Sequence, residues 1–282
     1  MKHATGRDAD DYVIAAAQFA SVADVQANLT KIEELSRRAA KSGADIVVFP
    51  EAAMYDWNSS GSEIAAAAHA SGDLFTTELL RIATEQHITV IAGAFVTGPG
   101  ERPLNRLIAA SPDGHVVGTY DKVHLYDAFS YRESEKVEAG AVDEGMSELC
   151  VVQLGPIKLG LMNCYDLRFP EMARALIDAG ANVIAVSSAW VSGPHKEMHW
   201  ETLLRARAIE NTCYVLGSSQ PPPASVGLTM IVDPFGLVAS TCTENEGIVT
   251  SQISLSRLDE VRKIIPSLEH RRYAVVPAQQ TP

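Results

Sequence analysis

The sequence predicts an α/β fold built from two β-sheets with helices on their outer faces. Apolar runs typical of strands alternate with helical periodicity, and a strand–helix–strand order occurs twice, in residues 12–49 and again in residues 157–188. Strand hairpins accompany these two units, which a purely parallel, doubly wound sheet does not explain. We therefore expect mixed sheets within a single domain that comprises residues 1–282.

Composition and charge narrow the class of protein. The chain is 46% hydrophobic and 21% charged, as expected for a globular enzyme-sized domain. Its net charge of −12 argues against nucleic acid or an anionic membrane as the main partner, because both require a positive surface. The N-terminal residues MKHATGRDADD carry charges where a signal peptide needs an apolar core, and no apolar run approaches the roughly 18 residues of a spanning helix. We expect a cytoplasmic protein.

The first half of the chain begins with a buried strand over Tyr12–Phe19. Asp24 is a good N-cap for a helix over Val25–Ser42, and Gly43 a good stop. A parallel strand over Ile46–Phe49 should follow. Next come a Gly/Ser loop and an alanine-rich helical piece. After them we expect an amphipathic helix, three strands and a long ordered loop, at Leu74–His87, Thr89–Phe95, Leu104–Ser111, Val116–Tyr120 and Asp121–Gly140 respectively.

The second half begins with a hairpin that turns at Gly155-Pro156 and leads into a helix, a strand, a longer helix and another strand. We place these elements at Leu149–Leu154, Ile157–Met162, Glu171–Ala179, Val183–Ser188, Lys196–Asn211 and Tyr214–Ser218. A closing meander, a final helix and an extended arm complete the chain. Their predicted ranges are Met230–Val232, Leu237–Ser240, Ile248–Ile253, Leu255–Ile264 and Pro266–Pro282.

Cys164 is the reactive candidate among the four cysteines. Cys150 and Cys213 lie in apolar runs, where cysteine usually behaves as a small buried hydrophobe, and Cys242 has no ionisable neighbours in sequence. Cys164 instead follows a strand and precedes Pro170, which suits the first turn of a helix. We expect its side chain to be exposed at the positive end of the helix dipole, where a thiolate is favoured.

Three apolar strands each end at a residue with useful chemistry: Glu51, Lys122 and Cys164. Taken singly, each has a simpler explanation, as a solvated carboxylate, a surface charge or an inert thiol. Together they suit a cysteine nucleophile, with Glu51 as general base and Lys122 as oxyanion donor. The backbone N–H of Tyr165 would be the second donor. Such a site attacks a carbonyl or nitrile carbon, and the reaction class is C–N hydrolysis.

These motifs carry a family resemblance. FPE at Phe49–Glu51, DKVHLYD at Asp121–Asp127 and NCYDLRFPE at Asn163–Glu171 resemble the nitrilase or carbon–nitrogen hydrolase superfamily, in the same chain order and over about residues 12–258. The resemblance implies a four-layer αββα sandwich, a homodimer or higher homo-oligomer with the helical faces packed together, and no metal or cofactor. Residues 259–282 would then form a C-terminal extension at the dimer interface.

Further segments resemble the branch that contains deaminated-glutathione amidase and ω-amidase. They are Ser130–Ser134, Ser187–Pro194 and His199–Val215. The branch implies a second glutamate, Glu133, which would orient Lys122 or the attacking water, although Glu135 and Glu138 are near competitors. The loop between Lys122 and Glu133 is shorter than in the ω-amidase type. The implied reaction converts a small carboxamide to a carboxylate and ammonia.

Other activities use the same three residues, and a scaffold that has lost turnover is the non-enzyme alternative. The enzyme alternatives are a carbamoylase, an aliphatic amidase and a nitrilase.

Five more residues are candidates for substrate binding: Tyr55, His124, Arg168, Trp190 and His195. The aromatic residues could instead be core, and His124 a structural hydrogen-bonding group. Arg168 could instead form a buried ion pair with Asp166 that anchors the turn. His195 and His199 are four residues apart, but they lack an H-E-x-x-H motif and a third ligand, so we expect no zinc site.

Overall fold

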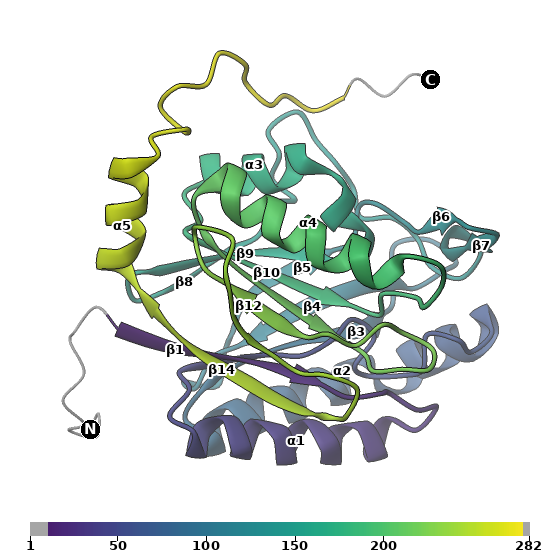
Figure 1. Cartoon of the computed structure of the whole chain (residues 1–282). Helices are drawn as coiled ribbons and strands as arrows, with labels where there is room; N and C mark the ends of the chain where they lie inside the picture. The colour runs from purple at the N-terminus through teal and green to yellow at the C-terminus, as the bar shows by residue number, and fades with distance from the viewer. Residues whose placement is uncertain (1–10, 279–282) are drawn as a thin grey trace.

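Two six-stranded sheets pack face to face in the computed structural model, which describes residues 11–278 (Figure 1). Helices cover the outer face of each sheet, which gives the four layers of an αββα sandwich. The fold class expected from the sequence is confirmed. The first ten and last four residues, which include most of the N-terminal segment and the end of the predicted arm, lie outside the described part.

The first sheet has the strand order β14-β1-β2-β3-β4-β5. Its strands are β1 (Asp11–Gln18), β2 (Ile46–Val48), β3 (Thr89–Val96), β4 (Leu104–Ala110), β5 (Val116–Asp121) and β14 (Gly247–Ser254). Strands β1 and β2 are parallel, as predicted, and β3 continues the parallel order beside β2. Helices α1 (Val25–Lys41) and α2 (Gly61–Gln86) cover its outer face, and Asp24 caps α1 by accepting a hydrogen bond from the amide of Ala27.

The second sheet has the order β13-β12-β11-β10-β9-β8, and when it is read from β8 to β13 its parallel and antiparallel pairings follow the same sequence as those of the first sheet from β14 to β5. Its strands are β8 (Val151–Leu154), β9 (Ile157–Asn163), β10 (Val183–Ser188), β11 (Tyr214–Ser219), β12 (Met230–Val232) and β13 (Val238–Thr241). Helices α3 (Pro170–Asp178) and α4 (Lys196–Asn211) cover its outer face (Figure 1). Each sheet therefore contains one of the two strand–helix–strand units seen in the sequence.

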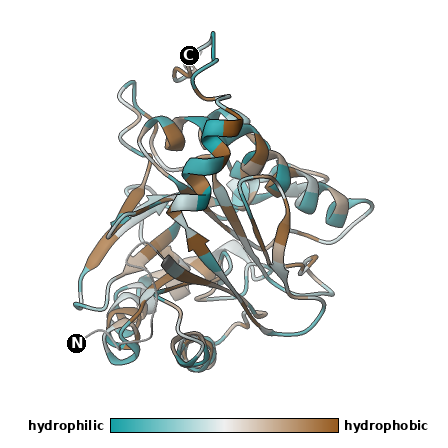
Figure 2. Ribbon diagram, turned by 60° about the vertical axis from the view of Figure 1, so that its left-hand side comes forward, coloured by the Kyte–Doolittle hydropathy of each residue, from teal (hydrophilic) through white to brown (hydrophobic). Residues whose placement is uncertain are grey.

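Apolar side chains fill the space between the sheets and the space under the helices. Along β1, Ile14 and Ala16 join the cluster between the sheets, whereas Ala15 and Ala17 join the cluster under α1 and α2. In Figure 2 brown, apolar segments occur in the strands between the helical layers, while the helices carry both teal and brown residues, as expected for elements with one buried and one exposed face. Because both faces of the central strands are buried, these strands read in sequence as continuous apolar runs.

Three sequence expectations are wrong in detail. The alanine-rich piece and the amphipathic helix are one continuous helix, α2, whose N-terminus is closed by a capping box between Ser60 and Glu63. The long loop after β5 contains a small hairpin of β6 (Asp127–Ala128) and β7 (Tyr131–Arg132) and the 3-10 helix η1 (Glu133–Glu135). The expected closing meander does not form, because β14 leaves the second sheet and pairs antiparallel with β1 in the first.

The last helix, α5 (Leu255–Ile264), begins directly after β14 and has the predicted bounds. From Pro266 to Ala278 the chain contains a turn but no helix or strand. Within residues 11–278, no helix combines the length and the apolar character needed to cross a bilayer.

Candidate active site

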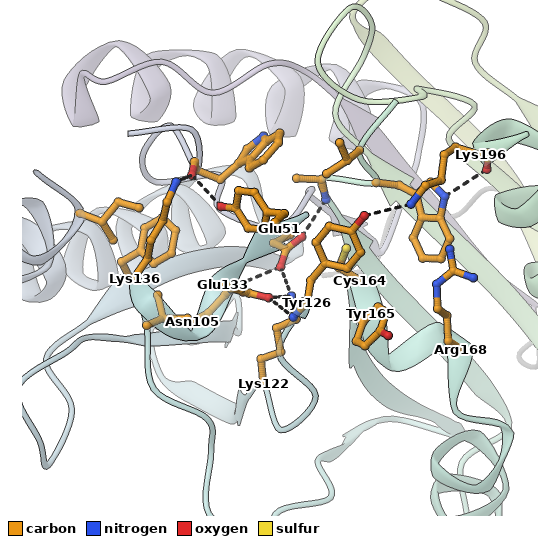
Figure 3. Close-up of a pocket in the computed structure, with 18 residues that line it drawn as sticks. Glu51, Asn105, Lys122, Tyr126, Glu133, Lys136, Cys164, Tyr165, Arg168 and Lys196 are labelled. Atoms are coloured by element: carbon orange, nitrogen blue, oxygen red, sulfur yellow. Dashed lines mark hydrogen bonds and ion pairs between the residues drawn. The ribbon is translucent and has the colours of Figure 1, made fainter. Parts of the chain in front are cut away.

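The strand ends bring four predicted residues to one cavity (Figure 3). Glu51 lies three residues after β2, Lys122 directly after β5 and Cys164 directly after β9, and Glu133 begins η1. All four line a cavity of about 560 Å³, a volume that includes the solvent at its mouth. The expectation that these side chains converge is therefore met in the geometry.

Lys122 bridges the two glutamates. Its Nζ donates hydrogen bonds to Glu51 Oε1 at 2.7 Å and to Glu133 Oε2 at 2.8 Å, and its side chain is only 1% exposed. Asn105, on β4, supports the same arrangement, because its Nδ2 donates to Glu51 Oε1 at 2.9 Å and to Glu133 Oε1 at 3.0 Å. The carboxylates therefore keep a fixed separation on either side of the ammonium group.

These contacts decide which groups are charged. Burial alone would raise the pKa of Glu51, but the charge and hydrogen bond of Lys122 hold that pKa below its ordinary value. Burial likewise opposes the charge on Lys122, yet Glu133 and Glu51 raise the pKa of Lys122 well above its usual range. Glu51 and Lys122 are thus ionised together.

Cys164 is in a different state from the one predicted. It is 7% exposed rather than open to solvent, and burial, followed by the negative charge of Glu51, raises the pKa of its thiol far above the ordinary value. The nearby Lys122 opposes this rise without overcoming it. The resting residue is therefore a thiol, and its proton must be removed at the moment of reaction.

The turn that presents Cys164 is a 3-10 helix, η2 (Cys164–Arg168), that precedes α3, so the thiol is not at the start of the α-helix as expected. Cys164 has a φ of 51°, in the left-handed region that side chains rarely adopt. The Asp166 carboxylate stabilises the turn: it accepts hydrogen bonds from the amide of Asn163 and the hydroxyl of Tyr120, at 2.8 and 2.7 Å. Such strain next to a reactive atom is typical of functional sites.

Asp166 does not pair with Arg168, so the alternative of a buried ion pair is wrong. The third partner of its carboxylate is His124, whose Nδ1 lies 2.7 Å from Asp166 Oδ1 and whose ring stacks on Phe169 with centroids 3.7 Å apart. His124 is thus a structural hydrogen-bonding group outside the cavity lining. The Arg168 guanidinium instead lies over the ring of Trp190, 4.7 Å from its centroid.

The other substrate-binding candidates divide between the cavity and the rest of the fold. Arg168 and Trp190 line the cavity, whereas Tyr55 packs against the apolar clusters near α2 and His195 is exposed at the N-cap of α4. The ring of Tyr165 also lines the cavity, and the role of its backbone N–H stays a prediction. Within the described residues, no group of three or more His, Cys, Asp or Glu is placed to hold a metal ion.

Sequence reasoning missed several lining residues. They are Trp57, Asn105, Tyr126, Tyr131, Lys136 and Lys196. The long loop predicted at Asp121–Gly140 supplies Tyr126, Tyr131 and Lys136. No sequence motif marks Asn105 or Lys196 as a site residue. Asn105 lies inside strand β4 and Lys196 at the start of helix α4, and the sequence patterns of both elements indicate only secondary structure.

The cavity is positively charged in a negatively charged protein. Four cationic side chains line it, Lys122, Lys136, Arg168 and Lys196, against the two carboxylates of Glu51 and Glu133. That is a formal excess of two positive charges inside a chain whose net charge is −12. The sign of the cavity favours an anionic small molecule.

Glu51 is held by contacts from both sheets. Its Oε2 accepts a hydrogen bond from the amide of Ala189 beyond β10, and its backbone carbonyl accepts one from Gln220 Nε2 beyond β11, both at 2.9 Å. On the other side, Gly93 of β3 lies so close that a Cβ there would be 2.5 Å from the amide nitrogen of Ala52. Only glycine fits at residue 93 while Glu51 keeps this position.

Two mixed sheets between helical layers enclose one charged cavity that contains a buried cysteine, a lysine and two glutamates, an arrangement that suits a hydrolase. Residues 13–263 match the carbon-nitrogen hydrolase family, and the chain therefore belongs to that family. The family predicted from the three motifs is confirmed.

Named relatives agree with this assignment. The chain is 34% identical to deaminated glutathione amidase of Escherichia coli O157:H7, over 93% of this chain and 98% of the relative. It is also 34% identical to human deaminated glutathione amidase, over 92% of this chain and 82% of the relative. Among solved structures, the Caenorhabditis elegans NitFhit protein superposes with a TM-score of 0.87 at 29% identity, covering 98% of this chain and 69% of that chain.

Proposed function

We propose that this hydrolase cleaves the C–N bond of a small carboxamide through an acyl-thioester on Cys164. The observation that carries the proposal is the Lys122 ammonium, held between Glu51 and Glu133 in the cavity that also contains the thiol. A buried thiol with a raised pKa needs a base close by, and Glu51, whose pKa is lowered, is ionised and available to act as one.

The reaction proceeds in two halves. Glu51 takes the thiol proton as Cys164 Sγ attacks the carbonyl carbon, and the carbonyl oxygen becomes an oxyanion that Lys122 and the Tyr165 amide stabilise. The C–N bond then breaks, Glu51 returns the proton to the leaving nitrogen, and the thioester remains. A water molecule, deprotonated by Glu51, attacks the thioester and releases the carboxylate and the free thiol. Glu133 acts by positioning Lys122.

The acyl group of the substrate carries a carboxylate in this proposal. The excess positive charge of the cavity supports an anionic substrate, and Arg168 is a suitable ligand for its carboxylate. Relatives named deaminated glutathione amidase suggest that type of substrate, with an ω-amidase type as the neighbouring choice. The leaving group separates the two types of substrate. Hydrolysis of either amide bond of deaminated glutathione releases an amine, whereas the primary carboxamide of 2-oxoglutaramate releases ammonia, so the ammonia expected from the sequence applies only to the ω-amidase type.

An amide panel tests the function. We expect the protein to hydrolyse deaminated glutathione or 2-oxoglutaramate far faster than acetamide, a carbamoyl amino acid or an aliphatic nitrile, with the carboxylate product measured by mass spectrometry. A preference for carbamoyl or nitrile substrates would assign the protein to the corresponding sibling activity. No turnover of any compound would support the scaffold alternative.

Replacing Glu51 with glutamine should make alkylation of Cys164 strongly pH-dependent. Burial raises the thiol pKa, so below that pKa the thiolate fraction of a cysteine without a base rises about tenfold per pH unit. We expect the iodoacetamide rate of the variant to rise without a plateau from pH 7 to 9.5, while the wild type reacts faster at pH 7. Peptide mapping separates Cys164 from the other thiols, and a plateau below pH 8 in the variant would remove Glu51 as the base.

We also propose that the protein acts in the cytoplasm as a homodimer. All four cysteines are free thiols, which suits a reducing compartment. The exposed side chains of Tyr273 and Val276, beyond α5, suit burial against a second copy, in line with an interface formed by residues 259–282. Light scattering after gel filtration should give about twice the chain mass of 30.3 kDa, and a monomer mass would contradict the proposal.

A further inference from the structure

Lys196 is a buried lysine without a carboxylate partner. It is 5% exposed, it is the first residue of α4, and it lines the cavity that contains Cys164. Its Nζ donates a hydrogen bond to the Tyr126 hydroxyl at 3.0 Å and lies 3.6 Å from the centre of the Phe129 ring. Among the ion pairs of residues 11–278, none includes Lys196 or its neighbour Arg168.

Three features of this environment oppose a positive charge. Burial, followed by the like charge of Arg168, lowers the pKa of Lys196, and the N-terminus of α4 presents the positive end of its dipole. The contacts with Tyr126 and Phe129 compensate only in part. Arg168 is in a similar position, since its Nε and one Nη are buried without a hydrogen-bond partner. An anion placed beside both cations would offset the repulsion between them and would accept hydrogen bonds from the unpaired N–H groups of Arg168.

The position of Lys196 is fixed before any ligand arrives. Its backbone carbonyl accepts a hydrogen bond from Trp190 Nε1 at 3.0 Å, which closes the segment between β10 and α4. Arg168 lies over the same Trp190 ring, so one tryptophan supports both cations. In Figure 3 the two cations lie together at one end of the cavity, beside Cys164, while Lys136 lies at the opposite end.

We propose that Lys196 is a specificity-determining residue that binds, together with Arg168, a carboxylate carried by the substrate. This inference rests on the proposed function and deepens it. It assigns the recognition of an anionic acyl group to a residue other than the proposed catalytic residues Cys164, Glu51 and Lys122. The competing explanation is a structural one, in which Lys196 only orders the rings of Tyr126 and Phe129.

Matched substrates separate these explanations. Succinamate carries a carboxylate, and 4-methylpentanamide replaces that carboxylate with an isopropyl group of the same shape. For Lys196→Met, which keeps most of the length of the side chain and removes its charge, we expect the ratio of kcat/KM for succinamate to kcat/KM for 4-methylpentanamide to fall at least tenfold, mainly through KM. Lys41→Met at the exposed end of α1 makes the same charge change and should leave the ratio unaltered.

A structural role predicts equal losses on both substrates, and that result would overturn the proposal. Lys196→Arg, which keeps the charge, should recover part of the ratio. Thermal unfolding of each variant identifies a folding defect. If Lys196→Met does not fold, Lys196→Gln gives the same comparison.

Binding without turnover separates this proposal from the amidase function. In a Cys164→Ala background, titration calorimetry with succinate should show binding that weakens at least tenfold when Lys196→Met is added. If the wild type hydrolyses no amide but succinate binding still depends on Lys196, the carboxylate site stands and the amidase proposal fails. If amides are hydrolysed and succinate affinity is the same with and without Lys196, the amidase function stands and the role of Lys196 is rejected.

Discussion

Replacing Cys164 with alanine is expected to lower turnover by about 10,000-fold or more, because no other group in the cavity can form the thioester. The change removes one buried sulfur atom, and alanine adopts the same backbone region with the same strain as cysteine. Stability should therefore change by only about 1 kcal/mol. Amide hydrolysis and thermal unfolding, measured on the same preparation, check both parts of the expectation.

Cys242→Ala is the matched control. Cys242 is a half-buried free thiol that does not line the cavity, so its loss should leave the rate unchanged. Substantial hydrolysis by Cys164→Ala, at more than about one hundredth of the wild-type rate, would rule out the thioester mechanism.

Replacing Lys122 with methionine is expected to abolish formation of the acyl-thioester and to destabilise the fold. Removing one oxyanion donor costs about 100- to 1,000-fold in rate. Here the loss also leaves Glu51 and Glu133 buried without a cation, and a broken buried pair costs about 3–5 kcal/mol. We expect a large fall in kcat and a lower unfolding temperature, with intact-mass measurements showing no acyl adduct.

The stability defect of Lys122→Met should depend on pH. Without the ammonium, the two carboxylates repel each other and the pKa of at least one rises above its unfolded value, so the variant regains stability as the pH falls toward that value. The defect should thus be larger at pH 8 than at pH 5. Lys158→Met on the exposed surface of β9 is the control for charge alone. An acyl adduct formed at the wild-type rate would remove Lys122 from the oxyanion role.

The sequence predicted the placement of Glu51, Lys122 and Cys164 because a simple rule connects them. Each follows a strand whose apolar run is easy to recognise. Strands β2 and β5 belong to the first sheet and β9 to the second, and the packing of the two sheets brings the residues after all three strands to one cavity. The resemblance then added Glu133, which the structure places on the far side of Lys122 from Glu51. The helices α1, α4 and α5 were also predicted to within a residue or two, since each has a clear periodicity or cap.

Features that depend on distant packing could not be predicted. The burial of Cys164 arises from residues of several elements around the cavity, and no local pattern reports it. Asn105 lies within an ordinary buried strand, and only the approach of Glu51 and Glu133 gives it a role. Lys196 begins a helix with an amphipathic pattern, in which a lysine is expected to be exposed. Its burial results from the packing of α4 against the loop that contains Tyr126, and the local sequence does not report that packing.

The pairing of β14 with β1 has a consequence for how the protein is made. Asp11 pairs with Ser254 and Gln18 with Gly247, so the first sheet is complete only after almost the whole chain has left the ribosome. At about 5–20 residues per second, the nascent N-terminal half would keep an open strand edge for tens of seconds. An open edge of that kind is an aggregation hazard, so the yield of folded enzyme should depend on translation speed and on chaperones that cover β1 during synthesis.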